Sequence, residues 1–221
     1  MLDVSSPPKP LLRGVSHQVA FFVALAGAIS LLFYAIHVRD SGMPDRPIWG
    51  VVTYGASLCG LFGTSALYHR VPWEPAAEAW MRRLDHSAIF ALIAGTFTPL
   101  AVRLGAGAVS ALSLIWGGAV LGMLQACFWK GAPRAVPAVL AVLLGWSMLP
   151  FLVALHPLVG SGSLALVGIG GVLYSAGAVV YARKRPDPSP HIFGYHEVFH
   201  ALTIVAALCH YVAVVRVVGS A

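Results

Sequence analysis

The sequence predicts an all-α, polytopic membrane protein, a bundle of seven transmembrane helices with a cytoplasmic N-terminus. The first observation is composition: of 221 residues, 58% are hydrophobic and only 10% are charged, whereas a soluble domain carries about 25% charged residues. The second is that apolar runs of about 20 residues, long enough to cross a bilayer, recur along nearly the whole chain. No basic-aromatic pattern typical of nucleic-acid binding is present, so we expect no nucleic-acid partner.

The expected spans are apolar on all sides, as is typical of helices surrounded by lipid and by other helices. The connections between them are short, which leaves room for a single transmembrane domain over residues 1–221 and for no second soluble one. Pro99, late in the third span, and Pro137 and Pro150, in the fifth, predict local kinks. In chain order the spans cover residues 18–36, 48–69, 84–102, 109–129, 135–155, 164–182 and 196–215.

The basic residues predict the orientation. With the N-terminus inside, the inner segments carry Lys9, Arg13, Arg70, Arg82, Arg83, Lys130, Arg134, Arg183, Lys184 and Arg185. The outer segments carry Arg39, Arg46, Arg103 and Arg216. Because Lys and Arg concentrate on the cytoplasmic side, we expect a multi-pass protein of the cell (plasma or inner) membrane with its N-terminus inside and its C-terminus outside.

The seventh span opens with the sequence His196-Glu197-Val198-Phe199-His200. Histidines four residues apart share one helical face and can bind one metal ion, and H-E-x-x-H is the pattern of zinc hydrolases with the glutamate as base. An interfacial histidine pair without a metal explains the same spacing. The segment alone leaves both interpretations open, and an intramembrane protease is one form of the first.

The topology favours the metal site. The second span ends at the inner face with Ser65 and His69 on one helical face, and the third opens there with Asp85. These residues therefore lie at the same depth as His196 and His200, although the histidine spacing was not used to assign the orientation. We expect no part in this site for the remaining histidines, which are His17, His37, His86, His156, His191 and His210.

The chemistry fits one zinc ion, which in catalytic sites has three protein ligands and an open position that activates water. We predict His69, His196 and His200 as the ligands, Asp85 as general base, and Ser65 as a group that orients water or polarises a substrate carbonyl. Glu197 competes with Asp85 for the role of base. We prefer Asp85, because a basic cluster next to Glu197 offers it ordinary salt partners; the cluster is Arg183, Lys184 and Arg185.

Four motifs together resemble the hemolysin III family, the bacterial branch of the progestin and adipoQ receptor superfamily. They are Ser65-x-x-x-His69, Arg82-Arg83-Leu84-Asp85-His86, Ala94-Gly95-Thr96-Phe97-Thr98-Pro99 and Tyr195-His196-Glu197-x-x-His200. The resemblance covers nearly the whole chain. It implies seven helices with a cytoplasmic N-terminus and a zinc ion near the inner face, with ligands that match His69, His196 and His200, beside residues that match Asp85 and Ser65.

The adiponectin-receptor branch and the related alkaline ceramidases look like lipid amide hydrolases. We therefore expect a zinc-dependent intramembrane hydrolase of lipid amide or ester bonds, with a membrane lipid as substrate or ligand. Two alternatives remain open. One is a receptor or signalling protein whose zinc is structural, with Asp85 as fourth ligand. The other is a hemolysin-type membrane-lytic protein, although no row of polar residues lines an aqueous path through the spans.

Overall fold

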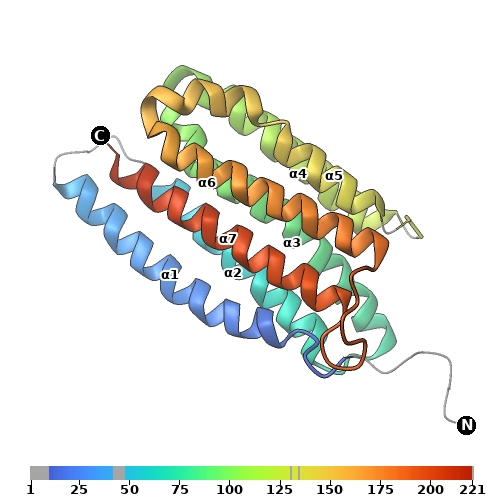
Figure 1. Ribbon diagram of the computed structural model, residues 1–221. Helices are drawn as coiled ribbons and strands as arrows, with labels where there is room; N and C mark the ends of the chain where they lie inside the picture. Colours follow the sequence, from blue (N-terminus) through green and yellow to red (C-terminus); the bar gives the residue numbers. More distant parts are fainter. Residues whose placement is uncertain (1–9, 42–47, 130, 134, 221) are drawn as a thin grey trace, which may run out of the picture.

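The computed structural model describes residues 10–41, 48–129, 131–133 and 135–220, and the protein is all-α within them. Of the basic residues used for the orientation, Lys9, Arg46, Lys130 and Arg134 lie outside this part. The described elements are α1 (Val15–Asp40), α2 (Ile48–Arg70), α3 (Pro75–Ala101), the short 3-10 helix η1 (Val102–Gly107), α4 (Ala108–Phe128), α5 (Ala135–Trp146), α6 (Leu149–Arg183) and α7 (Tyr195–Gly219) (Figure 1).

The helices form a closed bundle in which each packs against its neighbours in the sequence. The last helix, α7, packs against α6 and also against α1, which closes the ring (Figure 1). One helix, α3, contacts α2, α4, α5 and α7 and so lies towards the middle of the bundle. Residues at the end of α2, the start of α3 and the start of α7 are thereby brought together.

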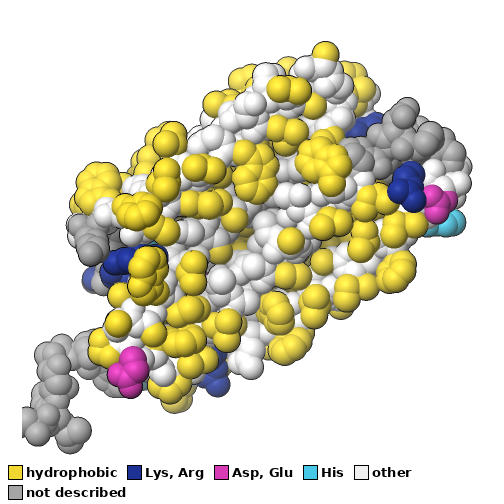
Figure 2. All heavy atoms as spheres, turned by 180° about the vertical axis from the view of Figure 1, so that it is seen from behind, with side chains coloured by type: hydrophobic (Ala, Val, Ile, Leu, Met, Phe, Trp, Pro, Cys, Tyr) yellow, Lys and Arg dark blue, Asp and Glu magenta, His cyan; other side chains and the backbone are white. Residues whose placement is uncertain are grey.

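Five stretches of the described chain are long and apolar enough to cross a membrane, and α5 is a shorter apolar helix. These stretches are Val15–Asp40, Ile48–Arg70, Pro75–Phe128, Leu149–Arg183 and Tyr195–Gly219. Their outward side chains are apolar: Phe22, Phe33 and Leu121, for example, are exposed. Figure 2 shows hydrophobic side chains over most of one face and charged ones at its two ends. Such a surface suits lipid, and the chain is a polytopic membrane protein.

Two glycines mark sharp breaks in these stretches. Gly105, in η1, has φ 56° and separates α3 from α4, which then pack side by side. Gly160 has φ 75° and interrupts the helical backbone of α6. A left-handed backbone is readily adopted by glycine, because other residues pay a steric cost there. Pro75–Phe128 and Leu149–Arg183 thus each contain a change of direction.

The region expected as one kinked fifth span is divided. α5 ends at Trp146, and a turn at Ser147 and Met148 separates it from the start of α6. Pro150 lies in the first turn of α6, where a missing backbone N–H costs nothing. The proline therefore begins a new helix, and the break falls just before it.

Candidate metal centre

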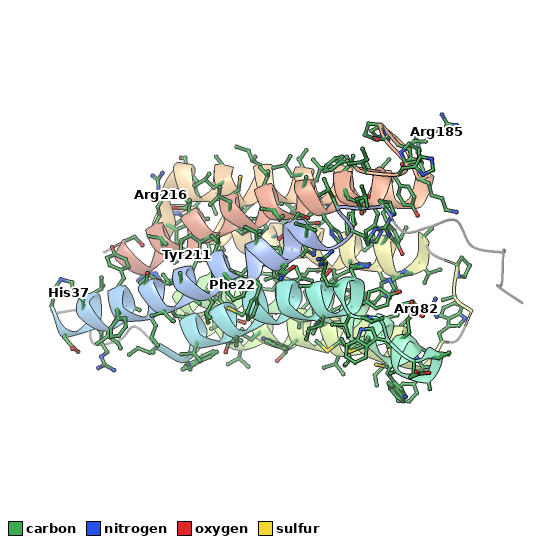
Figure 3. All side chains as sticks on the ribbon, turned by 90° about the horizontal axis from the view of Figure 1, so that it is seen from below. Phe22, His37, Arg82, Arg185, Tyr211 and Arg216 are labelled. Atoms are coloured by element: carbon green, nitrogen blue, oxygen red, sulfur yellow. The ribbon has the colours of Figure 1, made fainter. Side chains whose placement is uncertain are left out.

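Two helices bring three histidines together at one end of the bundle. His69 lies in the last turn of α2, and His196 and His200 lie in the first turns of α7, four residues apart and therefore on one face. We call this end, where α2 ends and α7 begins, the histidine end. Arg82 and Arg185 lie at this end, whereas His37 and Arg216 lie at the opposite one (Figure 3).

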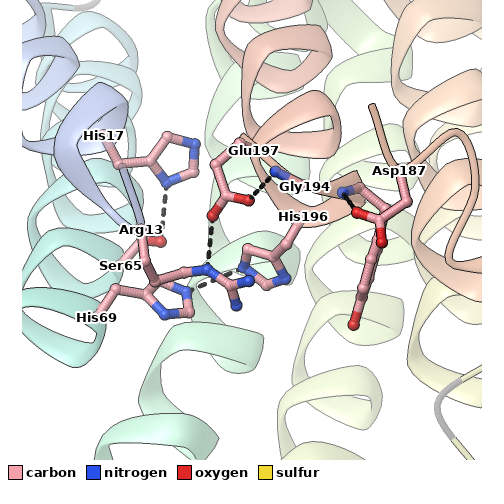
Figure 4. Close-up of polar contacts among 9 residues, drawn as sticks. Arg13, His17, Ser65, His69, Asp187, Gly194, His196 and Glu197 are labelled. Atoms are coloured by element: carbon pink, nitrogen blue, oxygen red, sulfur yellow. Dashed lines mark hydrogen bonds and ion pairs between the residues drawn. The ribbon is translucent and has the colours of Figure 1, made fainter. Parts of the chain in front are cut away.

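The geometry of the three imidazoles suits one metal ion. The Nε2 atoms of His69 and His196 lie 3.1 Å apart (Figure 4). In tetrahedral zinc sites Zn–N is 2.0–2.1 Å, which places two ligand nitrogens about 3.3 Å apart. His200 completes the group: one ligand atom from each of the three residues lies within 4.8 Å of the others. The donor set therefore fits a metal ion such as zinc, with small side-chain rotations.

The burial of His200 also suits a ligand. Its side chain is 1% exposed, and its Nδ1 has no hydrogen-bond partner among the described residues. A buried polar nitrogen without a partner is costly in a folded protein. Within the described part, no carboxylate belongs to the compact group formed by the three histidines. The cluster therefore offers a metal ion three nitrogen ligands.

Ser65 and Asp85, the two residues expected to act beside the ligands, lie near this cluster. Ser65 is buried one turn before His69 on α2, and Asp85 lies on α3. Both residues line the same cavity as His196 and His200. The carboxylate of Asp85 thus shares a cavity with the histidine cluster without belonging to the compact group.

Glu197 does not belong to the compact group of three histidines. It is 1% exposed, and its Oε1 accepts a 2.6 Å hydrogen bond from Nε of Arg13, while its Oε2 accepts one of 2.8 Å from the backbone N–H of Gly194 (Figure 4). The second bond caps the start of α7. The expectation of a surface salt partner near Arg183 is therefore corrected: the partner is Arg13, and the pair is largely buried. With both oxygens engaged, Glu197 is poorly placed as a base.

His17 was not expected at the site, yet it is in contact with it. This residue of α1 is 3% exposed; its Nδ1 lies 2.8 Å from Oγ of Ser65, and its ring stacks on that of His200 at 3.6 Å between centroids. The signal was available. The first span starts at the same face as His69 and His196, so the regular rise of a helix already predicts His17 at their depth.

His86 and His210 differ in their distance from the cluster. His86, on α3, lines the cavity beside Asp85, although the sequence analysis expected no part for it in this site. His210 lies three to four turns further along α7 than His196, about 20 Å away at 1.5 Å per residue. Its Nε2–H donates to the carbonyl of Val167 at 3.0 Å. His210 therefore stays outside the metal group, as its position in the sequence predicts.

A cavity of about 520 Å³ extends from the histidine cluster into the bundle. It reaches from His196 and Asp85 at one end to His210 deep in the membrane region. Its volume lies within the range of small-molecule sites, about 300–1,000 Å³. Most of its wall is apolar, with contributions from α3, α5, α6 and α7 that include Ile89, Phe97, Ala141, Leu152, Val167 and Phe199.

Fold and site together define a polytopic membrane protein with a three-histidine cluster suited to a metal ion. The family model described as "Haemolysin-III related" matches residues 5–211, so the chain belongs to this family and the resemblance in its motifs is confirmed. The chain is 23% identical over 197 residues to the "Hemolysin-3 homolog" of Bacillus subtilis (strain 168), with 87% of this chain and 86% of the relative covered.

Two further relatives extend this comparison. The chain is 27% identical over 175 residues to "Hemolysin-3" of Bacillus cereus, with 78% of each protein covered. It is 30% identical over 200 residues to "Heptahelical transmembrane protein ADIPOR2" of Oryza sativa subsp. japonica, with 78% of this chain and 82% of the relative covered.

Proposed function

We propose that the protein is a zinc-dependent intramembrane hydrolase that cleaves an amide or ester bond of a membrane lipid. The observation that carries the proposal is the position of three clustered imidazoles, with a serine and an aspartate beside them, at the end of a long apolar cavity. A polar reaction centre joined to an apolar tunnel suits a substrate with a polar headgroup and an alkyl chain.

Each residue has a role that follows from its place. A zinc ion held by His69, His196 and His200 would polarise the substrate carbonyl and make water nucleophilic at neutral pH. Asp85 would accept the proton of the attacking water and return it to the leaving amine or alcohol. Ser65, between Asp85 and the ligands, would hold the carboxylate in place or donate to the carbonyl oxygen.

The enzyme is favoured over a structural metal site by the ligand set. A structural zinc site is closed by four protein ligands, and Asp85 is the residue that would have to close this one. In the described part of the chain the compact group contains only histidines, and Asp85 lines the adjoining cavity. This arrangement supports an open position beside the cavity.

To test this function, zinc content and turnover of a fluorescent N-acyl lipid amide should be measured on the purified protein and two variants. We expect about one zinc per wild-type chain, loss of zinc in His196→Ala, and retained zinc with turnover reduced at least ~100-fold in Asp85→Asn, because general base catalysis contributes about 10²–10⁴-fold. Wild-type protein without stoichiometric metal would refute the proposal. Loss of zinc in Asp85→Asn would favour the structural site.

We also propose seven spans, with the N-terminus in the cytoplasm. The breaks at Gly105 and Gly160 support this count. They divide Pro75–Phe128 and Leu149–Arg183, so that α3, α4, the segment from α5 to Gly160 and the rest of α6 could each be one pass. Basic residues support the orientation. Among the described ones, Arg13, Arg70, Arg82, Arg83, Arg183, Lys184 and Arg185 lie towards the histidine end, and Arg39, Arg103 and Arg216 towards the other.

Reporter fusions check this topology. Alkaline phosphatase, which folds only outside the cytoplasm, should be active when fused after the C-terminus, and green fluorescent protein fused there should not fluoresce after export. The matched control carries each reporter in the segment between α6 and α7, where the pattern should be reversed. Active phosphatase at both positions would contradict the proposed topology.

A further inference from the structure

The described chain brings a fourth histidine into contact with the cluster. His17 comes from α1, a helix that contributes no ligand, and it enters because the preceding residues pass directly against His69. Gly14 makes this possible. Its φ is 77°, and a Cβ there would lie only 2.6 Å from Cβ of His69. The start of α1 is therefore fitted closely to the end of α2.

The first contact of His17 is with a ligand. Its ring lies parallel to that of His200, with an interplanar angle of 10°. The same ring meets Phe62 edge-on, at 5.1 Å between centroids. The ring of His200 also meets those of His196 and Phe199, at 4.4 and 5.7 Å between centroids. The stack on His17 is closer than either and covers the flat face of His200.

The second contact of His17 is with the hydroxyl of Ser65, which has only one proton. If Ser65 donates that proton to the carboxylate of Asp85, the Ser65 oxygen must be the acceptor in its contact with His17, and the imidazole must donate an N–H. Nδ1 of His17, 2.8 Å away, is in position to donate it. His17, Ser65 and Asp85 then form a chain with one direction, in which each hydrogen bond orients the next group.

We propose that His17 is a positioning residue of the metal centre: it holds the ring of His200 by stacking and directs the hydroxyl of Ser65 towards Asp85. This inference rests on the proposed zinc-dependent function. It assigns His17 no contact with the ion or with the substrate. The two contacts use different parts of the imidazole, the flat face and Nδ1, so different substitutions separate them.

Two variants test the two contacts on the full-length protein in detergent. His17→Phe keeps a flat ring against His200 but cannot donate to Ser65. His17→Asn keeps a short side-chain N–H and removes the ring. His37→Phe and His37→Asn, at the exposed far end of the same helix, are the matched controls (Figure 3). The measurements are zinc affinity by competition with a chelator, the visible spectrum of the Co²⁺-substituted protein, and turnover of the fluorescent lipid amide.

We expect His17→Asn to bind zinc about 10–100-fold more weakly and to show an altered Co²⁺ spectrum, as is typical when an outer contact of a ligand is lost. His17→Phe should bind zinc within about twofold of wild type and lose turnover by about tenfold or more. That loss should equal the loss in Ser65→Ala and should not increase in the double variant, because both changes break one chain of hydrogen bonds.

Wild-type zinc affinity in His17→Asn would overturn the role of the stacking. Wild-type turnover in His17→Phe would overturn the role of the hydrogen bond to Ser65. The two results together would overturn the whole inference. Failure of both to fold, with the His37 controls folded, would assign His17 to the stability of the bundle and would also overturn it. If the wild-type protein itself binds no stoichiometric zinc, the proposed function fails first. If wild type binds zinc and turns over substrate while the His17 variants match it, only the inference fails.

Discussion

Glu197 illustrates, at the scale of a residue, how neighbours in sequence can differ in role. It directly follows the ligand His196, but a helix turns about 100° per residue, so its side chain leaves the face that the histidines share. It meets Arg13 and the backbone N–H of Gly194 instead. The glutamate therefore ties the chain before α1 to the start of α7 and leaves the metal centre to other residues.

The variant Glu197→Gln tests this structural role. Loss of a charged, largely buried hydrogen bond to Arg13 should lower the free energy of unfolding by about 1.5–3 kcal/mol. Thermal unfolding of the purified protein would measure it. Zinc content should remain at the wild-type level, and its loss in folded protein would contradict the assignment. Asp40→Asn, which removes the exposed Arg39–Asp40 pair, is the control and should cost less than about 1 kcal/mol.

At the scale of elements, the segment before α1 links three parts of the histidine end. We call residues 10–14 the N-terminal strap. The backbone N–H groups of Leu11 and Leu12 donate to the carbonyls of His191 and Ile192, at 3.0 and 3.2 Å, in the segment before α7. Gly14, at the end of the strap, lies against His69. The strap thus joins α1, the end of α2 and the start of α7, which are the elements that carry His17 and the ligands.

Gly14→Ala tests the fit of the strap. A side chain at φ 77° is strained by about 1 kcal/mol, and its Cβ would also displace His69. We expect a lower unfolding temperature and weaker zinc binding, measured by thermal unfolding and chelator competition. Gly131→Ala is a matched control, because Gly131 has φ 83° but no atom within 4 Å of an added Cβ. Gly131→Ala should lower only the stability and leave zinc affinity unchanged. An equal loss of zinc affinity in both variants would contradict the role of the contact between residue 14 and His69.

At the scale of the whole molecule, the bundle encloses a cavity that begins at the histidines and continues between the helices. The cavity is long: its lining residues on α7 run from His196 to His210. Other hydrophobic side chains lie on the outer surface, as Figure 2 shows for one face. In the proposed function, a lipid substrate would move from the bilayer into the protein, with its acyl chain in this cavity and its amide or ester bond at the metal centre.

Gly168→Leu tests the use of the cavity. Gly168 lines it and has no atom within 4 Å of an added Cβ, so a leucine can enter the free space without disturbing the helices. Turnover of a long-chain lipid amide should fall about tenfold or more relative to a short-chain one, because a pocket discriminates by about 1–3 kcal/mol for small changes in fit. Zinc content should not change.

The control for this prediction is Gly117→Leu. Gly117 is exposed on α4, lies outside the cavity wall and also has free space around an added Cβ. It should leave the ratio of long-chain to short-chain turnover as in wild type. An unchanged ratio in Gly168→Leu would show that the acyl chain does not occupy this part of the cavity.

The sequence by itself determined the class of the protein and the three candidate ligands. Long apolar runs have few alternatives to membrane helices, since backbone polar groups must be satisfied within the helix in lipid. The regular rise of a helix converts sequence position into depth, so His69, His196 and His200 could be placed at one level before any packing was known. The same argument placed Ser65 and Asp85 near them.

Only the tertiary structure decided which side chains meet at that level. Depth says nothing about rotation around each helix axis or about which helices are neighbours, and these follow from packing of the whole bundle. Packing brought His17 onto His200 and turned Glu197 towards Arg13. It also divided the expected fifth span before Pro150, where a break between two helices satisfies the proline better than a kink within one.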